Sequence, residues 1–168
     1  MHLPQTTNQA DSFLQFNDVA DAANGHMFVA TNHGLYDFDP ARGFFKSIDF
    51  WKEIPDNAGW KDIRVLKIIG SKLYIGTLRG LVEIDIATHH CTVIGNKEQI
   101  SRADISSLYA DALKKLWIYS GNGVYRYDPI SHGILKFTLA DGIYNTSNDA
   151  GYFFKYGDDL FICYRAAY

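Results

Sequence analysis

The sequence predicts an all-β fold, namely a partial β-propeller of about three and a half blades, each a sheet of four antiparallel strands. Three observations predict it. A phrase of hydrophobic and turn residues recurs at a regular spacing, each repeat contains the signals of four short strands, and no segment shows the sustained periodicity of a long helix.

The recurring phrase begins at Met27, Leu73, Leu116 and Leu160, so its starts are separated by 46, 43 and 44 positions. A period of this length is typical of repeat architectures, and four short strands per repeat is typical of a propeller blade. The fourth copy reaches Tyr168 with only its first two strands. We therefore expect a piece of a longer propeller or a truncated gene product, which self-associates or joins the missing blades of a parent chain.

The strands are expected in the same order in every repeat. An apolar run comes first, then the aromatic and β-branched start of the phrase, an alternating stretch after a glycine turn, and a weaker final run. In the second repeat these four strands are 63–69, 73–77, the stretch after Gly80 and 91–94. In the third repeat they are 105–110, 116–120, the stretch after Gly123 and 134–137. Asn96–Arg102 is the best helical candidate, a turn or two long.

These strands divide the chain into a single partial propeller over residues 1–168. The predicted parts are a lead-in at 1–15, blade 1 at 16–49, blade 2 at 60–95, blade 3 at 104–138 and half of blade 4 at 149–168.

The composition is that of a soluble globular protein, since 47% of residues are hydrophobic and the net charge is only -3. Such a charge predicts no attraction to nucleic acid or acidic lipid. No run is long enough to span a bilayer, and Met1–Phe16 is too polar for a signal peptide. We expect no nucleic-acid partner and no direct membrane contact from this segment.

Three adjacent metal-binding residue types, His89, His90 and Cys91, do not predict a metal site. Neighbours on a strand point to opposite faces, and no fourth ligand follows at a useful spacing. Cys91 and Cys163 belong to different blades and different strand positions, so no disulfide is expected between them.

An aspartate recurs at the end of the alternating stretch, as Asp39, Asp85 and Asp128. Recurrence in every blade indicates that it closes a turn and argues against an acid–base pair. Because no phosphate loop, nucleophile elbow or defensible Ser/His/Asp arrangement occurs, we expect no catalytic residues, no cofactor and no enzyme activity in this chain.

A ligand site is expected at one mouth of the propeller. The turn between the second and third strands of a blade lies on the same face as the link to the next blade, so equivalent positions surround one opening. Flat rings and polar groups gather there, which is the mixture that sugars need. The candidate ligand-binding residues are Trp60, Arg79, Arg165, His33, Asn122, Trp51 and Asn148.

A plainer interpretation of these residues stays open. His33 and Asn122 precede glycines and could simply provide the positive φ of a hairpin turn. Arg79 and Arg165 could be solvated surface arginines, and the link that carries Trp51 and Trp60 could be structural.

The phrases also resemble a known family. Leu73–Gly80 (LYIGTLRG) and Leu116–Gly123 (LWIYSGNG), with the later Tyr-Asp-Pro at 127–129 and the junction Asp141–Asn145 (DGIYN), resemble two-component regulator propeller repeats. Such repeats are similar to those of the periplasmic sensor region of hybrid two-component histidine kinases in Bacteroides-type bacteria. The resemblance covers about Asn17 to the C-terminus. Positions that depart from the pattern are Ala30, Tyr119 and Cys163, which replace its glycine, and Ser120 and Tyr164, which replace its threonine.

The resemblance implies a periplasmic sensor segment that recognises an oligosaccharide or another small ligand and passes a signal through a dimer. Two other functions stay open. One is a protein-interaction propeller without a small-molecule site, and the other is a truncated propeller enzyme such as a lyase.

Overall fold

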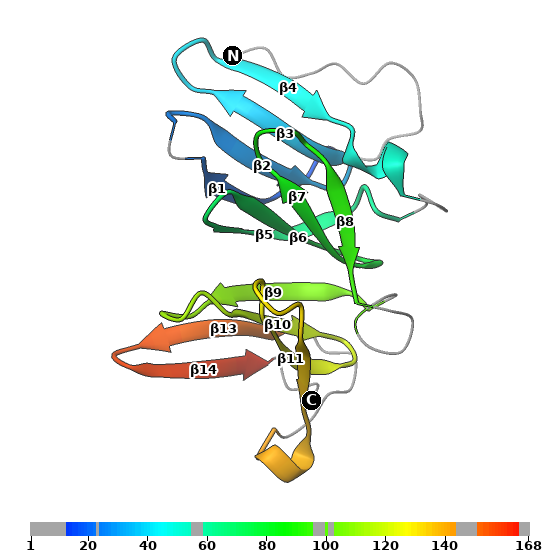
Figure 1. The fold of residues 1–168 in the computed structure, drawn as a ribbon. Helices are drawn as coiled ribbons and strands as arrows, with labels where there is room; N and C mark the ends of the chain where they lie inside the picture. The colour runs from blue at the N-terminus through cyan, green and yellow to red at the C-terminus, as the bar shows by residue number, and fades with distance from the viewer. Residues whose placement is uncertain are drawn as a thin grey trace.

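The computed structural model describes residues 13–22, 24–54, 59–95, 100, 103–143 and 151–164. Within them the chain forms three sheets of four strands and one sheet of two, each with its strands in sequence order (Figure 1). All pairings are antiparallel. The all-β fold of partial propeller blades is confirmed.

The strands of each blade follow one another along the chain. Blade 1 contains β1 (Phe16–Asp21), β2 (Met27–Thr31), β3 (Gly34–Asp39) and β4 (Phe44–Ile48). Blade 2 contains β5 (Ile63–Ile69), β6 (Lys72–Thr77), β7 (Gly80–Asp85) and β8 (Cys91–Ile94). Blade 3 contains β9 (Ile105–Ala110), β10 (Leu116–Ser120), β11 (Gly123–Tyr127) and β12 (Ile134–Phe137). Blade 4 contains β13 (Gly151–Tyr156) and β14 (Asp159–Tyr164).

Two short 3-10 helices, η1 (Phe50–Glu53) and η2 (Leu139–Asp141), follow blades 1 and 3. Of the helical candidate Asn96–Arg102, only Ile100 lies within the described residues, and it is in a turn.

The four sheets are stacked one on another, with their first strands side by side (Figure 1). Side-chain hydrogen bonds join consecutive first strands. The Asn17 amide donates to the Ile63 carbonyl oxygen at 2.6 Å, and the Ser106 hydroxyl donates to the Gly151 carbonyl oxygen at 2.9 Å. Residues about one repeat apart in the sequence therefore hold neighbouring blades together.

Alternation along each strand places a hydrophobic side chain in each of the two interfaces of a blade. In β6, Leu73 and Ile75 pack in the core between blades 1 and 2, whereas Tyr74 packs in the core between blades 2 and 3. All three side chains are fully buried. A blade in the middle of the stack is thus covered on both faces.

One position in the second strand sets how closely the next blade approaches. At Gly76, a Cβ atom would lie 2.6 Å from the Ile105 Cγ2 atom of blade 3. The equivalent residue of blade 3 is Tyr119, and its ring lies where a Cβ on Gly151 of blade 4 would be, at 2.3–2.7 Å. Between blades 2 and 3 the small residue is in the second strand (Gly76) and the large one in the next blade (Ile105), whereas between blades 3 and 4 the large residue is in the second strand (Tyr119) and the small one in the next blade (Gly151). This exchange explains why Tyr119 can replace the glycine of the repeat.

The turn between the second and third strands is built alike in all three complete blades. A buried hydroxyl of Thr31, Thr77 or Ser120 donates to the carbonyl oxygen of the glycine three residues later, at 2.8, 3.0 and 3.2 Å. Serine therefore substitutes for threonine without loss of this hydrogen bond. The positive φ belongs to the glycines, at 138° for Gly34 and Gly80, and not to the residues before them.

The turn between the third and fourth strands is closed by the recurring aspartate, as the sequence predicts. Asp39 Oδ1 accepts from the Ala41 N–H at 2.9 Å, Asp85 Oδ1 from the Ala87 N–H at 3.1 Å, and Asp128 Oδ1 from the Ile130 N–H at 2.9 Å. Four residues after each aspartate the chain takes a positive φ, at Gly43, His89 and His132.

Candidate functional site

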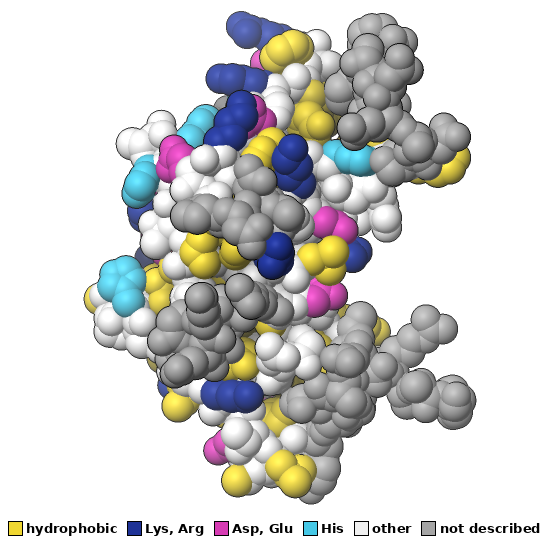
Figure 2. Space-filling view, turned by 90° about the vertical axis from the view of Figure 1, so that its right-hand side faces the viewer, with side chains coloured by type: hydrophobic (Ala, Val, Ile, Leu, Met, Phe, Trp, Pro, Cys, Tyr) yellow, Lys and Arg dark blue, Asp and Glu magenta, His cyan; other side chains and the backbone are white. Residues whose placement is uncertain are grey.

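The turns between second and third strands and the links between blades meet on one side of the stack, here called the mouth face. Backbone hydrogen bonds tie the two together, because Leu78 N–H donates to the Asp62 carbonyl oxygen at 3.3 Å and Gly121 N–H to that of Asp104 at 3.1 Å. The corresponding bond in blade 1 runs from Asn32 N–H to the Gln15 carbonyl oxygen at 3.2 Å. Figure 2 looks onto the side where η1 lies, and basic, acidic and hydrophobic side chains are interspersed on it.

The two tryptophans predicted to face a ligand lie in the core between blades 1 and 2. Trp51 and Trp60 are each only 7% exposed. The Trp51 ring reaches under the first turn, where a Cβ on Gly34 would lie 2.9 Å from it, and Lys61 Nζ sits 5.0 Å from its ring centre. In this structure the Trp51 ring supports the first turn from beneath and the Trp60 ring belongs to the same core, and direct stacking of either ring on a ligand stays a prediction.

Arg79 and His33 occupy equivalent turn positions and are half-buried. The aliphatic part of Arg79 packs on the link after blade 1, where a Cβ on Gly59 would lie 2.9 Å from Arg79 Cγ. The structure therefore brings Arg79 to the segment that carries Trp60. His33 has its backbone N–H bonded to the Thr31 hydroxyl at 3.0 Å.

Asn122, the equivalent residue in blade 3, is exposed, and its N–H is bonded to the Ser120 hydroxyl at 3.2 Å. Arg165 and Asn148 lie outside the described residues. The described part of the predicted site thus consists of three turn residues, which are exposed or half-buried, and two tryptophans buried in the core between blades 1 and 2.

A charged group that the predicted site omits lies at the same face. Arg64 is the extra residue of a β-bulge, since Ile63 pairs with Thr77 but Val65 pairs with Gly76. Its Nε atom lies 3.4 Å from Asp62 Oδ1, and both atoms are shielded from solvent without a hydrogen bond to any described residue. A bulge re-aims its side chain, which explains why simple alternation does not find Arg64.

Asp104 precedes β9 as Asp62 precedes β5. Although Asp104 is exposed as a whole, partial burial raises the pKa of its carboxyl group, an effect that Arg64 opposes and Asp62 reinforces. The mouth face therefore offers both guanidinium donors and carboxylate acceptors.

A polar residue recurs at the bulge position of the first strand, as Asn17, Arg64 and Ser106. This recurrence is the signal in the sequence from which the position of Arg64 could have been predicted.

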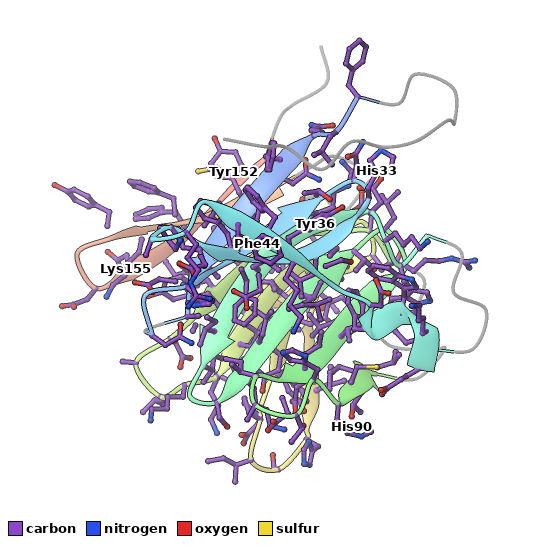
Figure 3. All side chains as sticks on the ribbon, turned by 90° about the horizontal axis from the view of Figure 1, so that it is seen from above. His33, Tyr36, Phe44, His90, Tyr152 and Lys155 are labelled. Atoms are coloured by element: carbon purple, nitrogen blue, oxygen red, sulfur yellow. The ribbon has the colours of Figure 1, made fainter. Side chains whose placement is uncertain are left out.

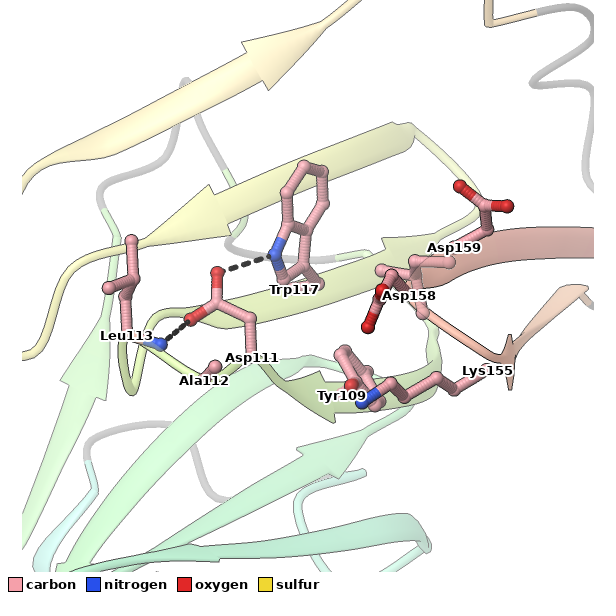
Figure 4. A pocket seen from close by; sticks show the side chains of 9 residues that line it. Tyr109, Asp111, Ala112, Leu113, Trp117, Lys155, Asp158 and Asp159 are labelled. Atoms are coloured by element: carbon pink, nitrogen blue, oxygen red, sulfur yellow. Dashed lines mark hydrogen bonds between the residues drawn. The ribbon is translucent and has the colours of Figure 1, made fainter.

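On the side of the stack opposite the mouth face, a hollow of about 320 Å³ lies between blades 3 and 4 (Figure 4). Trp117 and Tyr109 line it from blade 3, and Lys155, Asp158 and Leu160 from blade 4. The Trp117 indole N–H donates to Asp111 Oδ2 at 3.0 Å. Trp117 lies in a core strand, as its alternation predicts, but its ring is only partly covered.

Around His89, His90 and Cys91 the contacts are structural. His90 Nδ1 lies 3.5 Å from a Glu53 carboxylate oxygen, and burial together with that carboxylate raises the pKa of the Cys91 thiol to about 11. The thiol is therefore protonated at neutral pH. Both cysteines are free. Among the residues that the structure describes, no group of three or more His, Cys, Asp or Glu side chains could hold a metal ion.

A search of the described part of the chain finds no helix whose length and apolarity would allow it to cross a membrane.

A comparison with protein families found no match, and neither did a comparison with curated proteins. Solved structures do match. The extracellular domain of BT4673 from B. thetaiotaomicron, described as a one-component system, has a TM-score of 0.68 at 17% identity over 88% of this chain. The extracellular domain of BT3049, described as a hybrid two-component system of the same organism, has a TM-score of 0.56 at 18% identity over 71% of this chain.

The chain spans only 20% and 16% of the lengths of these two extracellular domains. The computationally designed Ika4 protein is also similar, with a TM-score of 0.61 at 10% identity, and there 98% of this chain covers 100% of the other. At these identities the likeness is one of fold. The blades of this chain are thus built like those of the extracellular domains of these two B. thetaiotaomicron proteins.

Proposed function

We propose that this chain is a segment of a ligand-sensing propeller from the extracellular or periplasmic region of a two-component signalling protein. The observation that carries the proposal is the mouth face, where the second-to-third strand turn and the link of each complete blade are hydrogen-bonded together. Side chains from successive blades therefore surround one surface, on a scaffold of rigid sheets. The fold-level likeness to extracellular domains of two-component systems supports the same function.

The ligand that we propose is an oligosaccharide. Its hydroxyl groups both donate and accept hydrogen bonds, so a surface that recognises it needs fixed donors and fixed acceptors. Arg79 and Asn122 would supply donors at the turns, and the carboxylates of Asp62 and Asp104 would supply acceptors next to them. His33 would extend this surface toward blade 1.

Trp51 and Trp60 have a supporting role in this proposal. The Trp51 ring packs beneath the first turn, and the Trp60 ring is buried in the core between blades 1 and 2. A Trp60→Ala change would open a cavity in the core, which costs about 3–5 kcal/mol, and would therefore confuse loss of fold with loss of ligand. The test must use surface residues.

Titration calorimetry after a glycan-array screen tests the proposal with the variant Arg79→Ala. Loss of a charged hydrogen-bond donor is worth about 1.5–3 kcal/mol, so the Kd for the best glycan should rise about tenfold or more. Arg42→Ala is the matched control, because Arg42 is 84% exposed on the opposite end of blade 1. It should leave the Kd unchanged.

Equal Kd values for the chain and for the Arg79→Ala variant would refute the mouth face as the site. If no glycan binds the chain at millimolar concentration, the oligosaccharide proposal fails.

A further inference from the structure

The first strands of neighbouring blades lie side by side in the stack, and each such contact is here called a seam (Figure 1). In the seam between blades 1 and 2, two side chains of β1 bond to the backbone of β5. The Asn17 amide donates to the Ile63 carbonyl oxygen at 2.6 Å. Asp18 Oδ2 accepts from the Leu66 N–H at 2.8 Å. Because hydrogen bonds are directional, this pair fixes the position of β5 along β1.

The seam between blades 3 and 4 has the same pair of bonds. The Ser106 hydroxyl donates to the Gly151 carbonyl oxygen at 2.9 Å, and the Ser107 hydroxyl oxygen accepts from the Phe153 N–H at 3.0 Å. Leu66 and Phe153 each pair with the third residue of the recurring phrase. The two seams are therefore bonded at equivalent positions.

The seam between blades 2 and 3 is built differently. The residues of β5 at the two bonding positions are Arg64, in the bulge, and Val65, after it. Val65 is apolar and cannot accept a hydrogen bond from β9. Arg64 lies toward its own link, with its Nε atom 3.4 Å from Asp62 Oδ1, and this Nε atom has no hydrogen bond to any described residue.

Hydrophobic side chains hold the seam between blades 2 and 3. A Cβ on Gly76 would lie 2.6 Å from both Ile105 Cγ2 and Val65 Cγ1, so the two blades approach closely there. The rings of Tyr74 and Tyr127 meet across the same interface, with their centres 6.1 Å apart. Hydrophobic contact is non-directional, so it resists separation of the blades more than a small slide of one along the other.

Charged groups from both blades meet at the mouth-face end of this seam. Asp104 is fixed to the turn of blade 3, because its carbonyl oxygen accepts from the Gly121 N–H at 3.1 Å. Burial raises the pKa of the Asp104 carboxyl group, and Arg64 opposes this increase from across the seam. Blade 2 thus presents a hydrogen-bond donor and blade 3 an acceptor, on the two sides of one seam.

We propose that the ligand on the mouth face bridges the seam between blades 2 and 3, with Arg64 as its donor in blade 2 and Asp104 as its acceptor in blade 3. This bridging role rests on the proposed function, and it adds which residues bind the ligand and what binding changes. Two neighbouring hydroxyl groups of a sugar suit the pair, because one accepts from the guanidinium group while the other donates to the carboxylate. The bridge supplies the directional bonds that this seam lacks, so an occupied mouth face holds blade 3 fixed against blade 2.

Hydrogen exchange of the Leu108 amide in the whole chain reports on this seam, since Leu108 is the residue of β9 that corresponds to Leu66. Arg64→Asn places an amide where blade 1 has Asn17, and it should bond to the Ile105 carbonyl oxygen. Exchange at Leu108 should then slow about fivefold without any ligand, the effect of one hydrogen bond. Arg64→Ala is the matched control, because it removes the arginine without adding the bond, and it should not slow exchange.

The ligand arm uses four neutral saccharides as probes, namely cellotetraose, mannotetraose, xylotetraose and galactotetraose, each at about 10 mM so that sites of millimolar Kd are filled. The saccharide that binds most tightly should slow exchange at Leu108 in the unchanged chain. Arg64→Ala and Asp104→Ala should each raise its Kd about tenfold or more and abolish this slowing. Arg42→Ala should change neither quantity.

The possible results separate this proposal from the proposed function. If Arg79→Ala weakens saccharide binding but Arg64→Ala and Asp104→Ala do not, the mouth face remains the site and the bridge across the seam is refuted. Binding that depends on Arg64 but leaves exchange at Leu108 unchanged refutes the fixing of the seam. The proposal also fails if none of the four saccharides binds, or if Arg64→Asn and Arg64→Ala give the same exchange at Leu108.

Discussion

Asp128 combines two contacts at one residue. One carboxylate oxygen closes the turn to Ile130, and the other lies 2.6 Å from Lys115 Nζ. The Lys115 hydrogen bond, with the Ile130 N–H, holds the pKa of Asp128 well below its usual value. The equivalent aspartates close the same turn, and the ion pair recurs in blade 2, where Lys72 Nζ lies 3.4 Å from Asp85 Oδ2.

The pH dependence of stability should reveal this ion pair. Because the folded-state pKa of Asp128 is depressed, ionised Asp128 stabilises the fold above the unfolded pKa of about 3.9, and this stability is lost as the pH falls through the folded pKa. Asp128→Asn should lower the urea midpoint at pH 7, and its deficit relative to the unchanged chain should shrink between about pH 5 and pH 2. Lys115→Met should show the same trend, and a deficit that stays constant with pH would rule out the ion pair as its cause.

The residue scale is also where the sequence is least informative. Trp51 and Trp60 occur in an irregular link, and nothing in their spacing shows that both rings turn inward into the core between blades 1 and 2. Arg64 is aimed by a bulge, which depends on pairing with β6 and not on its own neighbours in the sequence. Asp39, Asp85 and Asp128 were predictable because a turn-closing contact is local and recurs with the repeat.

At the scale of elements, the strands follow from the sequence because alternation and glycine turns are local signals. The fit between neighbouring blades does not, since it joins residues such as Tyr119 and Gly151 that are far apart in the chain. The blades pack closely when one of the two facing residues is large and the other is small. The sequence alone does not show which of the two facing residues is the large one.

The substitution Gly151→Ala tests that fit. Its new Cβ would lie within 2.3–2.7 Å of the Tyr119 ring, and overpacking of this kind costs about 1–3 kcal/mol. Thermal unfolding should therefore shift to lower temperature. Gly133→Ala is the control, because its Cβ would approach only the hydroxyl of Ser131, at 3.3 Å.

Tyr119→Ala should relieve the clash. The double variant should be more stable than the sum of the two single changes predicts. Simple additivity would show that the two residues are not in contact.

At the scale of the whole molecule, one face of each outer blade is not covered by another of the described blades. Blade 4 exposes Tyr152, Phe154 and Phe161 by 60%, 53% and 47% on the side away from blade 3. Blade 1 carries Val19, 52% exposed, and the partly buried Tyr36 on the side away from blade 2, and Figure 3 looks down onto this blade. Exposed hydrophobic side chains grouped on one face favour association with another molecule.

We propose that the partner is a second copy, with blade 4 of one chain packed on blade 1 of the other, since this repeats the blade-on-blade packing within the chain. Light scattering after gel filtration should show a species larger than the monomer. Phe154→Glu and Val19→Glu should each reduce it, and Ile130→Glu, at an 84% exposed turn residue, should not. Mixing the first two variants should restore a dimer through the one intact interface, whereas a monomer for the unchanged chain contradicts the proposal.

The reversed packing at Gly76 and Tyr119 also constrains how such a chain can evolve. Repeats arise and are exchanged by duplication and recombination, and identical units could be shuffled freely. If a second copy of blade 2 replaced blade 3, its glycine would face Gly151 and leave a void where the Tyr119 ring now lies. The blades of this protein are alike in backbone but are no longer interchangeable parts, so their order along the gene is fixed by the side chains that meet between them.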